Sequence, residues 1–204
     1  MKKDYVHLCI VLDASGSMAS IEDDIKGSLN TFMATQKNTP EQTVFDVFQF
    51  SDTVKHIVAH ADMTNYEGNL MNSYQCSGCT ALHDAICIAI DTIGKEFAEM
   101  PEEERPESVI VAIVTDGYEN ASKKYTLRDV KKRIDHQTNK YNWEFVYLAA
   151  NQDDFEAEHI SLSMGVTQRR NSMNQADLST IAREAICESL TQARTRNREK
   201  RSGK

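Results

Sequence analysis

The sequence lacks long apolar runs and segments that would separate domains. No stretch approaches the ~20 consecutive apolar residues that a membrane-spanning helix requires. No Gly-, Ser- or Pro-rich linker divides the 204 residues. Hydrophobic residues at 40% and charged residues at 26% are ordinary for a globular protein. We therefore expect a single domain over residues 1–193, followed by a short tail, and no association with a membrane.

Cysteine is scarce and irregularly spaced. The five cysteines are odd in number and scattered at positions 9, 76, 79, 87 and 187, which predicts no disulfide framework and agrees with a reducing compartment. Cys76 and Cys79 form a Cys-x-x-Cys pair. No second pair follows and His83 lacks zinc-finger spacing, so we expect neither a disulfide nor zinc there. The apolar run after Met1-Lys2-Lys3 is too short for a signal peptide and no cleavage site follows it, so a cytoplasmic protein is expected.

Motifs of several enzyme classes are missing as well. The sequence contains no Gly-x-Gly-x-x-Gly, no Gly-Lys-Ser/Thr phosphate loop and no Gly-x-Ser-x-Gly. No histidine follows a suitable predicted strand. Catalysis needs a base or nucleophile aimed at a substrate, so the sequence predicts a protein that is not an enzyme.

Two continuous apolar runs predict the centre of the fold. Val6 to Leu12 and Val109 to Thr115 are too short for ordinary helices and too continuously apolar for half-exposed strands, which favours buried parallel strands. Residues 43–50 and 54–59 also read as strands, and because only three residues separate them they must pair antiparallel. Helices are predicted near residues 21–38, 81–98, 127–138, 155–162 and 175–193, with Thr126 as a cap and a poor strand at 165–167. The pattern predicts an α/β fold with a doubly wound, mostly parallel sheet, one antiparallel edge strand and helices on both faces.

Short oxygen-bearing side chains follow both buried strands. Asp13, Ser15 and Ser17 occupy alternate positions on the turn after the first strand, and Asp116 follows the second. Thr80 stands at the start of a predicted helix. In open α/β sheets, ligands bind beyond the carboxyl ends of the strands. Oxygen ligands are those that a small hard cation such as Mg²⁺ prefers.

Asp-x-Ser-x-Ser at 13–17, Gly-x-Thr at 78–80 and the strand-end Asp-Gly at 116–117, in this order, resemble the von Willebrand factor A domain with its metal-ion-dependent adhesion site. The resemblance runs from about residue 4 to about residue 190 and is to a stand-alone intracellular form with a Rossmann-like sheet. It implies that Asp13, Ser15, Ser17, Thr80 and Asp116 hold Mg²⁺ or Mn²⁺. It also implies a binding module whose metal takes an Asp or Glu from a protein partner.

Each of these residues also has a structural interpretation. Asp13 could cap the next helix, although Ser20 with Asp23 already resembles a capping box. Thr80 could be a routine helix N-cap, and Asp116 could only form a turn with Gly117. The neighbouring residues His83, Asp84, Tyr118, Glu119 and Asn120 would lie around the rim of such a site, as partner contacts or as solvated side chains.

Two other functions are alternatives. A haloacid-dehalogenase-like phosphatase would use Asp13 as its nucleophile, but that family's pattern is Asp-x-Asp and Ser15 stands at the second position. A role in a nucleic-acid-handling assembly would use the tail. Residues 194–204 hold six basic residues and one acidic residue, a net of +5, so residues 1–193 carry −13 of the total −8. Only the tail would attract nucleic acid, and we expect it to be disordered beyond about Arg196.

Overall fold

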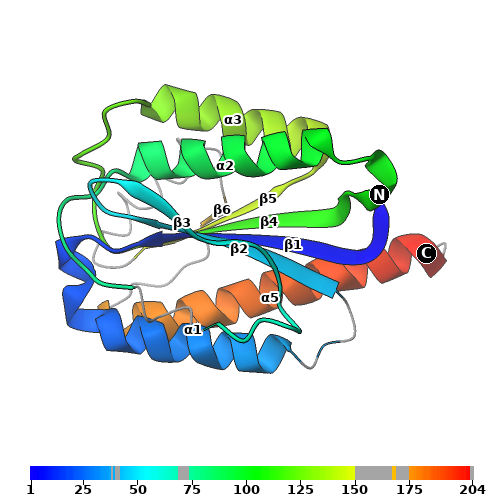
Figure 1. Ribbon diagram of the computed structural model, residues 1–204, viewed down its shortest axis with the longest axis horizontal. Helices are drawn as coiled ribbons and strands as arrows, with labels where there is room; N and C mark the ends of the chain where they lie inside the picture. The colour runs from blue at the N-terminus through cyan, green and yellow to red at the C-terminus, as the bar shows by residue number, and fades with distance from the viewer. Residues whose placement is uncertain (38, 40–41, 69–73, 150–166, 169–174, 203–204) are drawn as a thin grey trace.

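The computed structural model describes residues 1–37, 39, 42–68, 74–149, 167–168 and 175–202. A six-stranded sheet in the order β3-β2-β1-β4-β5-β6 forms the centre. Helices α2 and α3 cover one face and α1 and α5 cover the other (Figure 1). The strands are β1 (Lys2–Asp13), β2 (Gln42–Phe50), β3 (Val54–Asp62), β4 (Pro106–Thr115), β5 (Glu144–Ala149) and β6 (Thr167–Gln168). The helices are η1 (Gly16–Ile21), α1 (Glu22–Gln36), α2 (Leu82–Glu99), η2 (Glu102–Glu104), α3 (Leu127–Tyr141) and α5 (Gln175–Ser202).

The strand directions confirm the predicted fold class. β3 pairs antiparallel with β2 at one edge, and every other pair is parallel. The chain passes from β1 to β2 on one side and later places β4 on the other side of β1. The sheet therefore changes its winding direction between β1 and β4, the point at which open α/β sheets bind ligands.

Burial of both sheet faces explains the continuous apolar runs. Along β1, Leu8, Ile10 and Leu12 belong to the core beneath α1 and α5, whereas Cys9 and Val11 belong to the core beneath α2 and α3. Successive side chains of a strand point to opposite faces, so a strand covered on both sides needs apolar residues at nearly every position. His7 interrupts this pattern and is also fully buried.

Helix starts differ in part from the sequence prediction. The 3₁₀ helix η1 precedes α1, whose N-cap Ile21 makes no side-chain hydrogen bond, so the predicted capping role of Ser20 is wrong. Ala81, not Thr80, is the N-cap of α2. At α3 the prediction is confirmed, because Thr126 and Asp129 form a reciprocal capping box.

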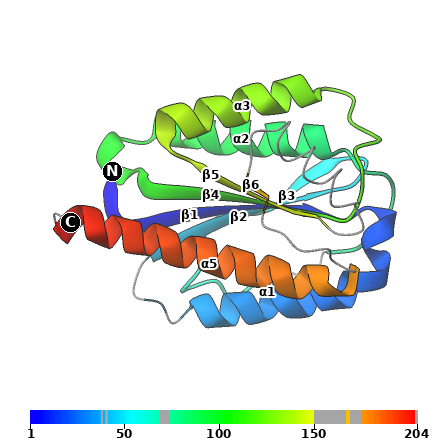
Figure 2. The same ribbon diagram turned by 180° about the vertical axis from the view of Figure 1, so that it is seen from behind.

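The last helix also differs from its prediction. Helix α5 continues to Ser202 along the sheet beside α1 (Figure 2). The predicted disorder beyond Arg196 is therefore wrong for the described residues. The reason is a polar stripe that continues the buried face after Ala193. Arg194 donates to Gln36 Oε1 at 2.9 Å and to Thr43 Oγ1 at 2.8 Å, and Asn197 is 1% exposed. The predicted boundary between the domain and the tail, at residue 193, therefore falls within α5.

Two minor elements are predicted between β5 and α5, and one of them falls on described residues. The predicted strand at 165–167 overlaps β6, which has two described residues. The predicted helix at 155–162 lies outside the described residues. Each helix in the described part of the chain is too short or too polar to span a lipid bilayer.

Candidate metal centre

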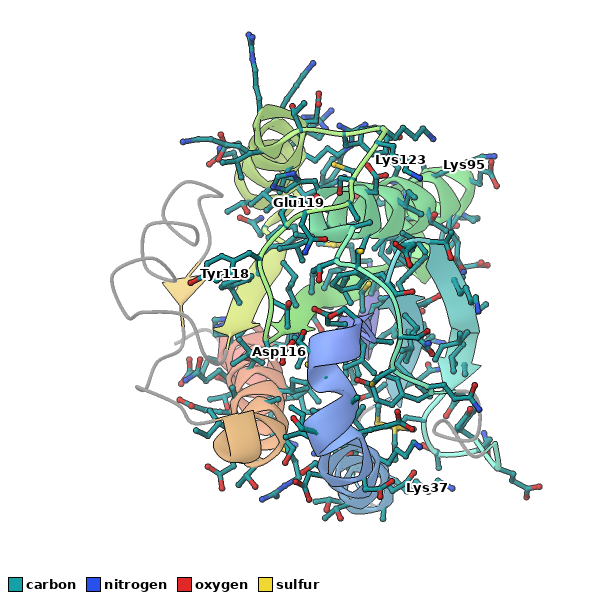
Figure 3. The ribbon with its side chains drawn as sticks, turned by 90° about the vertical axis from the view of Figure 1, so that its left-hand side faces the viewer. Lys37, Lys95, Asp116, Tyr118, Glu119 and Lys123 are labelled. Atoms are coloured by element: carbon teal, nitrogen blue, oxygen red, sulfur yellow. The ribbon has the colours of Figure 1, made fainter. Side chains whose placement is uncertain are left out.

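Three segments that are remote in sequence meet at the carboxyl end of the sheet. Figure 3 views this end directly, with Asp116 beside η1. The turn after β1 is bound to the segment before α2 by Gly16 N–H, which donates to Gly78 O at 3.0 Å, and by Ser77 N–H, which donates to Ala14 O at 2.8 Å. Gly78 adopts a φ of +80°, a conformation that glycine tolerates and most residues do not. These contacts position the Thr80 segment over the end of β1.

Asp13 is fully buried at this point, and both of its carboxylate oxygens are bound. Oδ1 accepts from Ser15 N–H at 2.7 Å and Oδ2 accepts from Thr115 Oγ1 at 2.6 Å. Burial raises the pKa of Asp13; the hydrogen bonds from Thr115 and Ser15 oppose this shift, and the nearby Asp116 adds to it. The ionised form of Asp13 is therefore costly here unless a cation accompanies it.

Ser15, Ser17 and Asp116 form a connected chain of oxygens. The Ser15 and Ser17 hydroxyls lie 3.1 Å apart, and Ser17 Oγ donates to Asp116 Oδ1 at 2.7 Å. Thr80 is adjacent, as the surroundings of Gly117 show. A Cβ built on Gly117 would lie 3.2 Å from Thr80 Oγ1 and 3.5 Å from Ser17 Oγ. The fold thus brings all five predicted residues to one edge, and the missing side chain at Gly117 leaves room beside their hydroxyls.

The residues fit a hard divalent cation. The set offers two carboxylates and three hydroxyls, all oxygen donors, and four of the five side chains belong to buried residues. Mg²⁺ and Mn²⁺ prefer oxygen ligands that include one or two carboxylates, whereas softer ions prefer imidazole or thiolate. Two acidic groups that approach each other at a buried position are also stabilised by a shared cation.

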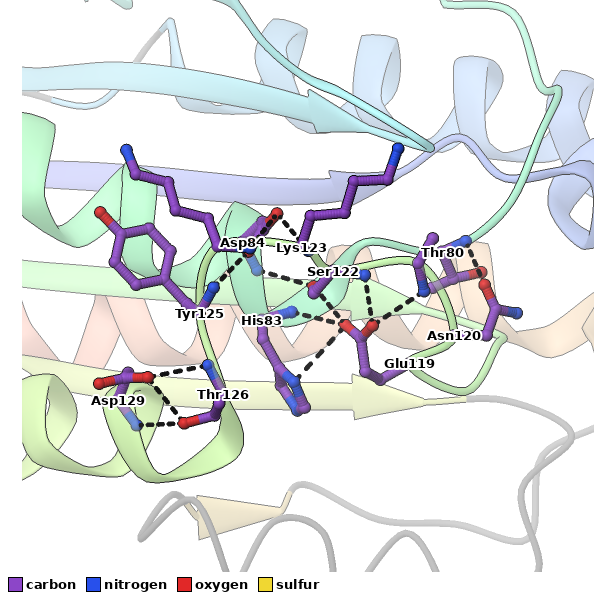
Figure 4. Close-up of polar contacts among 12 residues, drawn as sticks. Thr80, His83, Asp84, Glu119, Asn120, Ser122, Lys123, Tyr125, Thr126 and Asp129 are labelled. Carbon is purple, nitrogen blue, oxygen red and sulfur yellow. Dashed lines mark hydrogen bonds and ion pairs between the residues drawn. The ribbon is translucent and has the colours of Figure 1, made fainter.

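The loop that follows Asp116 is fastened to the start of α2 (Figure 4). Glu119 accepts from the backbone N–H of His83 at 2.9 Å and from the Ser122 hydroxyl at 2.6 Å. Asn120 Oδ1 accepts from Thr80 N–H at 2.9 Å. Burial alone would raise the pKa of Glu119, but the hydrogen bonds from Ser122 and His83 hold it below its ordinary value. Glu119 and Asn120 therefore orient the Thr80 segment.

Asp84 has a similar role further along the same loop. Its carboxylate accepts the backbone N–H groups of Lys123, Lys124 and Tyr125 at 2.8–3.3 Å. The sequence alone allowed two interpretations of these rim residues, as partner contacts or as solvated side chains. The structure gives Asp84, Glu119 and Asn120 a positioning role, while Tyr118 is 46% exposed beside Asp116.

Sequence reasoning missed one further group. His7, Asp46 and His60 come together from three strands, with their potential ligand atoms all within 4.8 Å of one another. They are far apart in the chain and match no motif spacing. The available signal was weak: a histidine and an aspartate interrupt the apolar central parts of β1 and β2.

The comparisons with known proteins agree with this architecture. The family model of the von Willebrand factor type A domain matches residues 7–186. The chain therefore belongs to the von Willebrand factor type A domain family, whose members generally serve as protein-interaction modules. No curated protein matches the sequence.

Solved structures with similar folds share little sequence with this chain. A von Willebrand factor type A protein from Catenulispora acidiphila is 17% identical with a TM-score of 0.59, over 90% of this chain and 42% of that one. The PilB minor pilin from Streptococcus sanguinis is 11% identical with a TM-score of 0.65, over 92% and 61%. BatB from Bacteroides thetaiotaomicron is 12% identical with a TM-score of 0.61, over 92% and 98%. The chain thus spans about half the length of the first two, and at these identities the likeness concerns the fold alone.

Proposed function

We propose that this protein is a metal-dependent interaction module that binds a carboxylate of a protein partner. The observation that carries the proposal is the convergence of Asp13, Ser15, Ser17, Thr80 and Asp116 at the point where the sheet changes its winding direction. These residues would hold Mg²⁺ or Mn²⁺. When bound, the ion supplies a coordination position that an Asp or Glu side chain of a partner can fill.

The residues of the chain contribute in different ways. Three of the five ligand side chains are neutral hydroxyls, so the positive charge of a bound cation is only partly balanced. Thr115 and the Ser15 N–H orient Asp13 through hydrogen bonds of 2.6 and 2.7 Å. Ser17 carries its hydroxyl on the exposed turn and also binds Asp116. A partner can therefore reach the site from solvent without displacing the buried Asp13.

The charge of the whole chain supports a local attraction. The net charge of −8 disfavours an acidic ligand over most of the surface. The metal would supply the attraction, and an inner-sphere bond is screened far less than exposed charges are. Once a partner has been captured, we expect removal of the metal by a chelator to weaken its binding to this protein more than moderate salt does.

Each interface carboxylate of the partner would then be changed to its amide. If all those variants bind normally, the proposed mode of binding is wrong.

The metal site is tested first, by calorimetric titration of the full chain with Mg²⁺. The Asp13→Ala variant should lose binding and keep its fold, because Asp13 is the last residue of β1 and the apolar run of the strand precedes it. Asp24→Ala is the matched control, since Asp24 is exposed in the first turn of α1, and it should bind Mg²⁺ as the wild type does. Equal Mg²⁺ affinity in wild type and Asp13→Ala would contradict the proposal.

Two alternatives have less support. For a phosphatase, Ser15 stands where the dehalogenase-like pattern needs a second Asp, and absence of turnover of a generic phosphate ester would separate that class from a binding module. For nucleic-acid binding, the basic tail is largely part of α5: Arg194 is buried and Arg196 pairs with Glu144. Salt-dependent binding of nucleic acid would be the evidence for that role.

We also propose that the protein is not an enzyme and acts in the cytoplasm. The absence of the enzyme motifs noted in the sequence supports the first point. For the second, all five cysteines are free thiols in the structure, and Cys9 and Cys87 are buried as small core residues. A reducing compartment suits such a set of thiols.

A further inference from the structure

A second cluster of ligand atoms lies away from the Asp13 site. His7 of β1, Asp46 of β2 and His60 of β3 meet beneath α2, where the His7 ring packs edge-on against Phe97 at 4.9 Å between centroids. His7 precedes Asp13 by six residues on the same strand, which is about 20 Å at ~3.3 Å per residue. The two sites therefore share no ligand: the Asp13 site lies at the carboxyl end of β1, and His7 lies in the middle of that strand.

The contacts within this cluster are close but poorly aligned for hydrogen bonds. His7 Nε2 lies 3.0 Å from Asp46 Oδ2, and both side chains are 0% exposed. Neither atom has a hydrogen-bond partner among the described residues, and the same holds for His7 Nδ1. Buried polar atoms are nearly always satisfied. A nitrogen and a carboxylate oxygen that lie side by side, without pointing at each other, are suited to converge on a common cation.

His60 completes the cluster from the edge strand. Its Nδ1 lies 2.6 Å from Glu96 Oε1 of α2, again without hydrogen-bond alignment. The backbone at His60 has a φ of +45°, which is uncommon outside glycine, and the pairing of β2 with β3 changes register on both sides of Val47. Bulges and disfavoured backbone conformations often re-aim side chains at binding sites. Here they direct Asp46 and His60 toward His7.

The remaining contacts leave one ligand atom per residue. Tyr5 Oη lies 3.2 Å from His60 Nε2, so that nitrogen is engaged and Nδ1 is the ligand atom. Asp46 Oδ1 is bound by His56 Nε2 at 2.5 Å and by His60 N–H at 3.1 Å, which leaves Oδ2. Outer partners of this kind fix the orientation of metal ligands in known metal sites.

We infer that His7, Asp46 and His60 form a Zn²⁺ site. Two imidazoles and a carboxylate make a borderline nitrogen and oxygen set that suits zinc and not Mg²⁺. With bonds of about 2.1 Å, ligand atoms of a tetrahedral site lie about 3.4 Å apart, close to the 3.0 Å between His7 and Asp46. The half-exposed Glu96 and His60 leave the ion an entry path, since His60 and Tyr5 line an open cavity of about 440 Å³.

Such an ion would tie the antiparallel edge strand β3 to β1 and β2. Three protein ligands from three strands leave one coordination position for water or a further group. The inference does not rest on the proposed carboxylate-binding function, because no ligand is shared with the Asp13 site.

The test is calorimetric titration of the metal-free full chain with Zn²⁺ in excess Mg²⁺, so that the Asp13 site is filled by the other ion. We expect one equivalent of Zn²⁺ to bind to the wild type, and binding weaker by at least about 100-fold in His60→Ala. Tyr5→Phe should weaken affinity by about 10-fold, because it removes only an orienting contact. Asp13→Ala and His136→Ala, which changes an exposed histidine of α3, should bind Zn²⁺ like the wild type.

A second readout keeps the inference testable if a variant fails to fold. Co²⁺ bound to the wild type should give the ligand-field absorption of a four-coordinate site with nitrogen ligands, which an octahedral oxygen site does not give. The inference is overturned if the wild type binds no stoichiometric Zn²⁺. It is equally overturned if Zn²⁺ binding disappears in Asp13→Ala and survives in His60→Ala.

Discussion

Gly117 decides how much room the metal-site hydroxyls have. A Cβ at this position would lie 3.2 Å from Thr80 Oγ1, closer than nine in ten real Cβ contacts, and 3.5 Å from Ser17 Oγ. The glycine is therefore needed for the space it leaves rather than for its conformation. An Asp-Gly pair after a strand is also a common turn signal, so the sequence alone did not separate these two reasons.

We expect Gly117→Ala to weaken Mg²⁺ binding by about tenfold while it changes the free energy of unfolding by less than about 1 kcal/mol, because only the ligand hydroxyls must shift. Calorimetry and denaturant unfolding measure the two quantities. Gly27→Ala is the matched control: Gly27 is an exposed position of α1 with no atom within 4 Å of an added Cβ. That change should raise stability by ~0.5–1 kcal/mol and leave Mg²⁺ affinity unchanged. A Gly117→Ala variant with normal affinity would show that Thr80 and Ser17 do not ligate.

At the scale of elements, the loop after β4 and helix α2 act as one unit. Glu119 accepts N–H groups from α2 and from its own loop, and Asp84 accepts three from the end of that loop. Two acidic side chains thus replace the regular backbone pairing that a loop lacks. Asn120, in the same loop, accepts the N–H of Thr80 and so fixes the position of that residue.

Glu119→Gln should lower the free energy of unfolding by about 1–2 kcal/mol at neutral pH, because an amide nitrogen would face N–H donors. The pKa of Glu119 is lowered in the folded protein. Its stabilising contribution is therefore present above the ordinary value of 4.5 and is lost as the pH falls through the folded-state pKa. The difference between wild type and variant in urea unfolding should accordingly shrink on acidification. A difference that stays constant down to low pH would contradict this account.

Helix α5 is attached by a buried cation. Arg194 donates to Gln36, Thr39 and Thr43, and burial lowers its pKa. Arg194→Ala should cost about 2–4 kcal/mol of stability, since it leaves the buried Gln36 and Thr43 without this donor. Lys200→Ala, at an exposed position of the same helix, should change stability by less than about 0.5 kcal/mol. Thermal unfolding of the two variants distinguishes a docked helix from a dispensable tail, and equal Tm values would favour the tail.

At the scale of the whole molecule, the Asp13 site joins segments that are about a hundred residues apart in the chain. Any cation that binds only the folded form stabilises it, by ~2.7 kcal/mol at a concentration 100 times its Kd. We expect saturating Mg²⁺ to raise the Tm of the wild type and not that of Asp13→Ala. A shift of the same size in both would place the stabilising ion elsewhere.

The increase in stability that Mg²⁺ gives should depend on pH. Because the folded-state pKa of Asp13 is raised above 3.8, the contribution of Asp13 to the stability of the metal-free protein is lost as the pH rises through that pKa. Metal binding needs the ionised carboxylate, so the Mg²⁺ increment should grow over the same pH range. Unfolding with and without Mg²⁺ across this range tests the sign of the effect.

The sequence by itself determined the fold class, because strands covered on both faces must be apolar at nearly every position and β1 and β4 show that pattern. It also contained the five candidate metal ligands, since three of them share one short turn and the others end or follow predicted elements. The predicted cap at Ser20 and the predicted disorder beyond Arg196 were wrong for the same reason. Capping and helix continuation depend on what the neighbouring elements present, and Gln36 and Thr43 accept Arg194 only after the helices have packed.

Only the tertiary structure decided how remote segments combine. Asp13 and Asp116 become neighbours because β1 and β4 are adjacent, and Thr80 joins them because Gly78 and Ser77 bind the turn after β1. The meeting of His7, Asp46 and His60 depends on strand register and on a bulge between β2 and β3. No local pattern encodes such a register, because it is set by the balance of side-chain packing across the whole sheet.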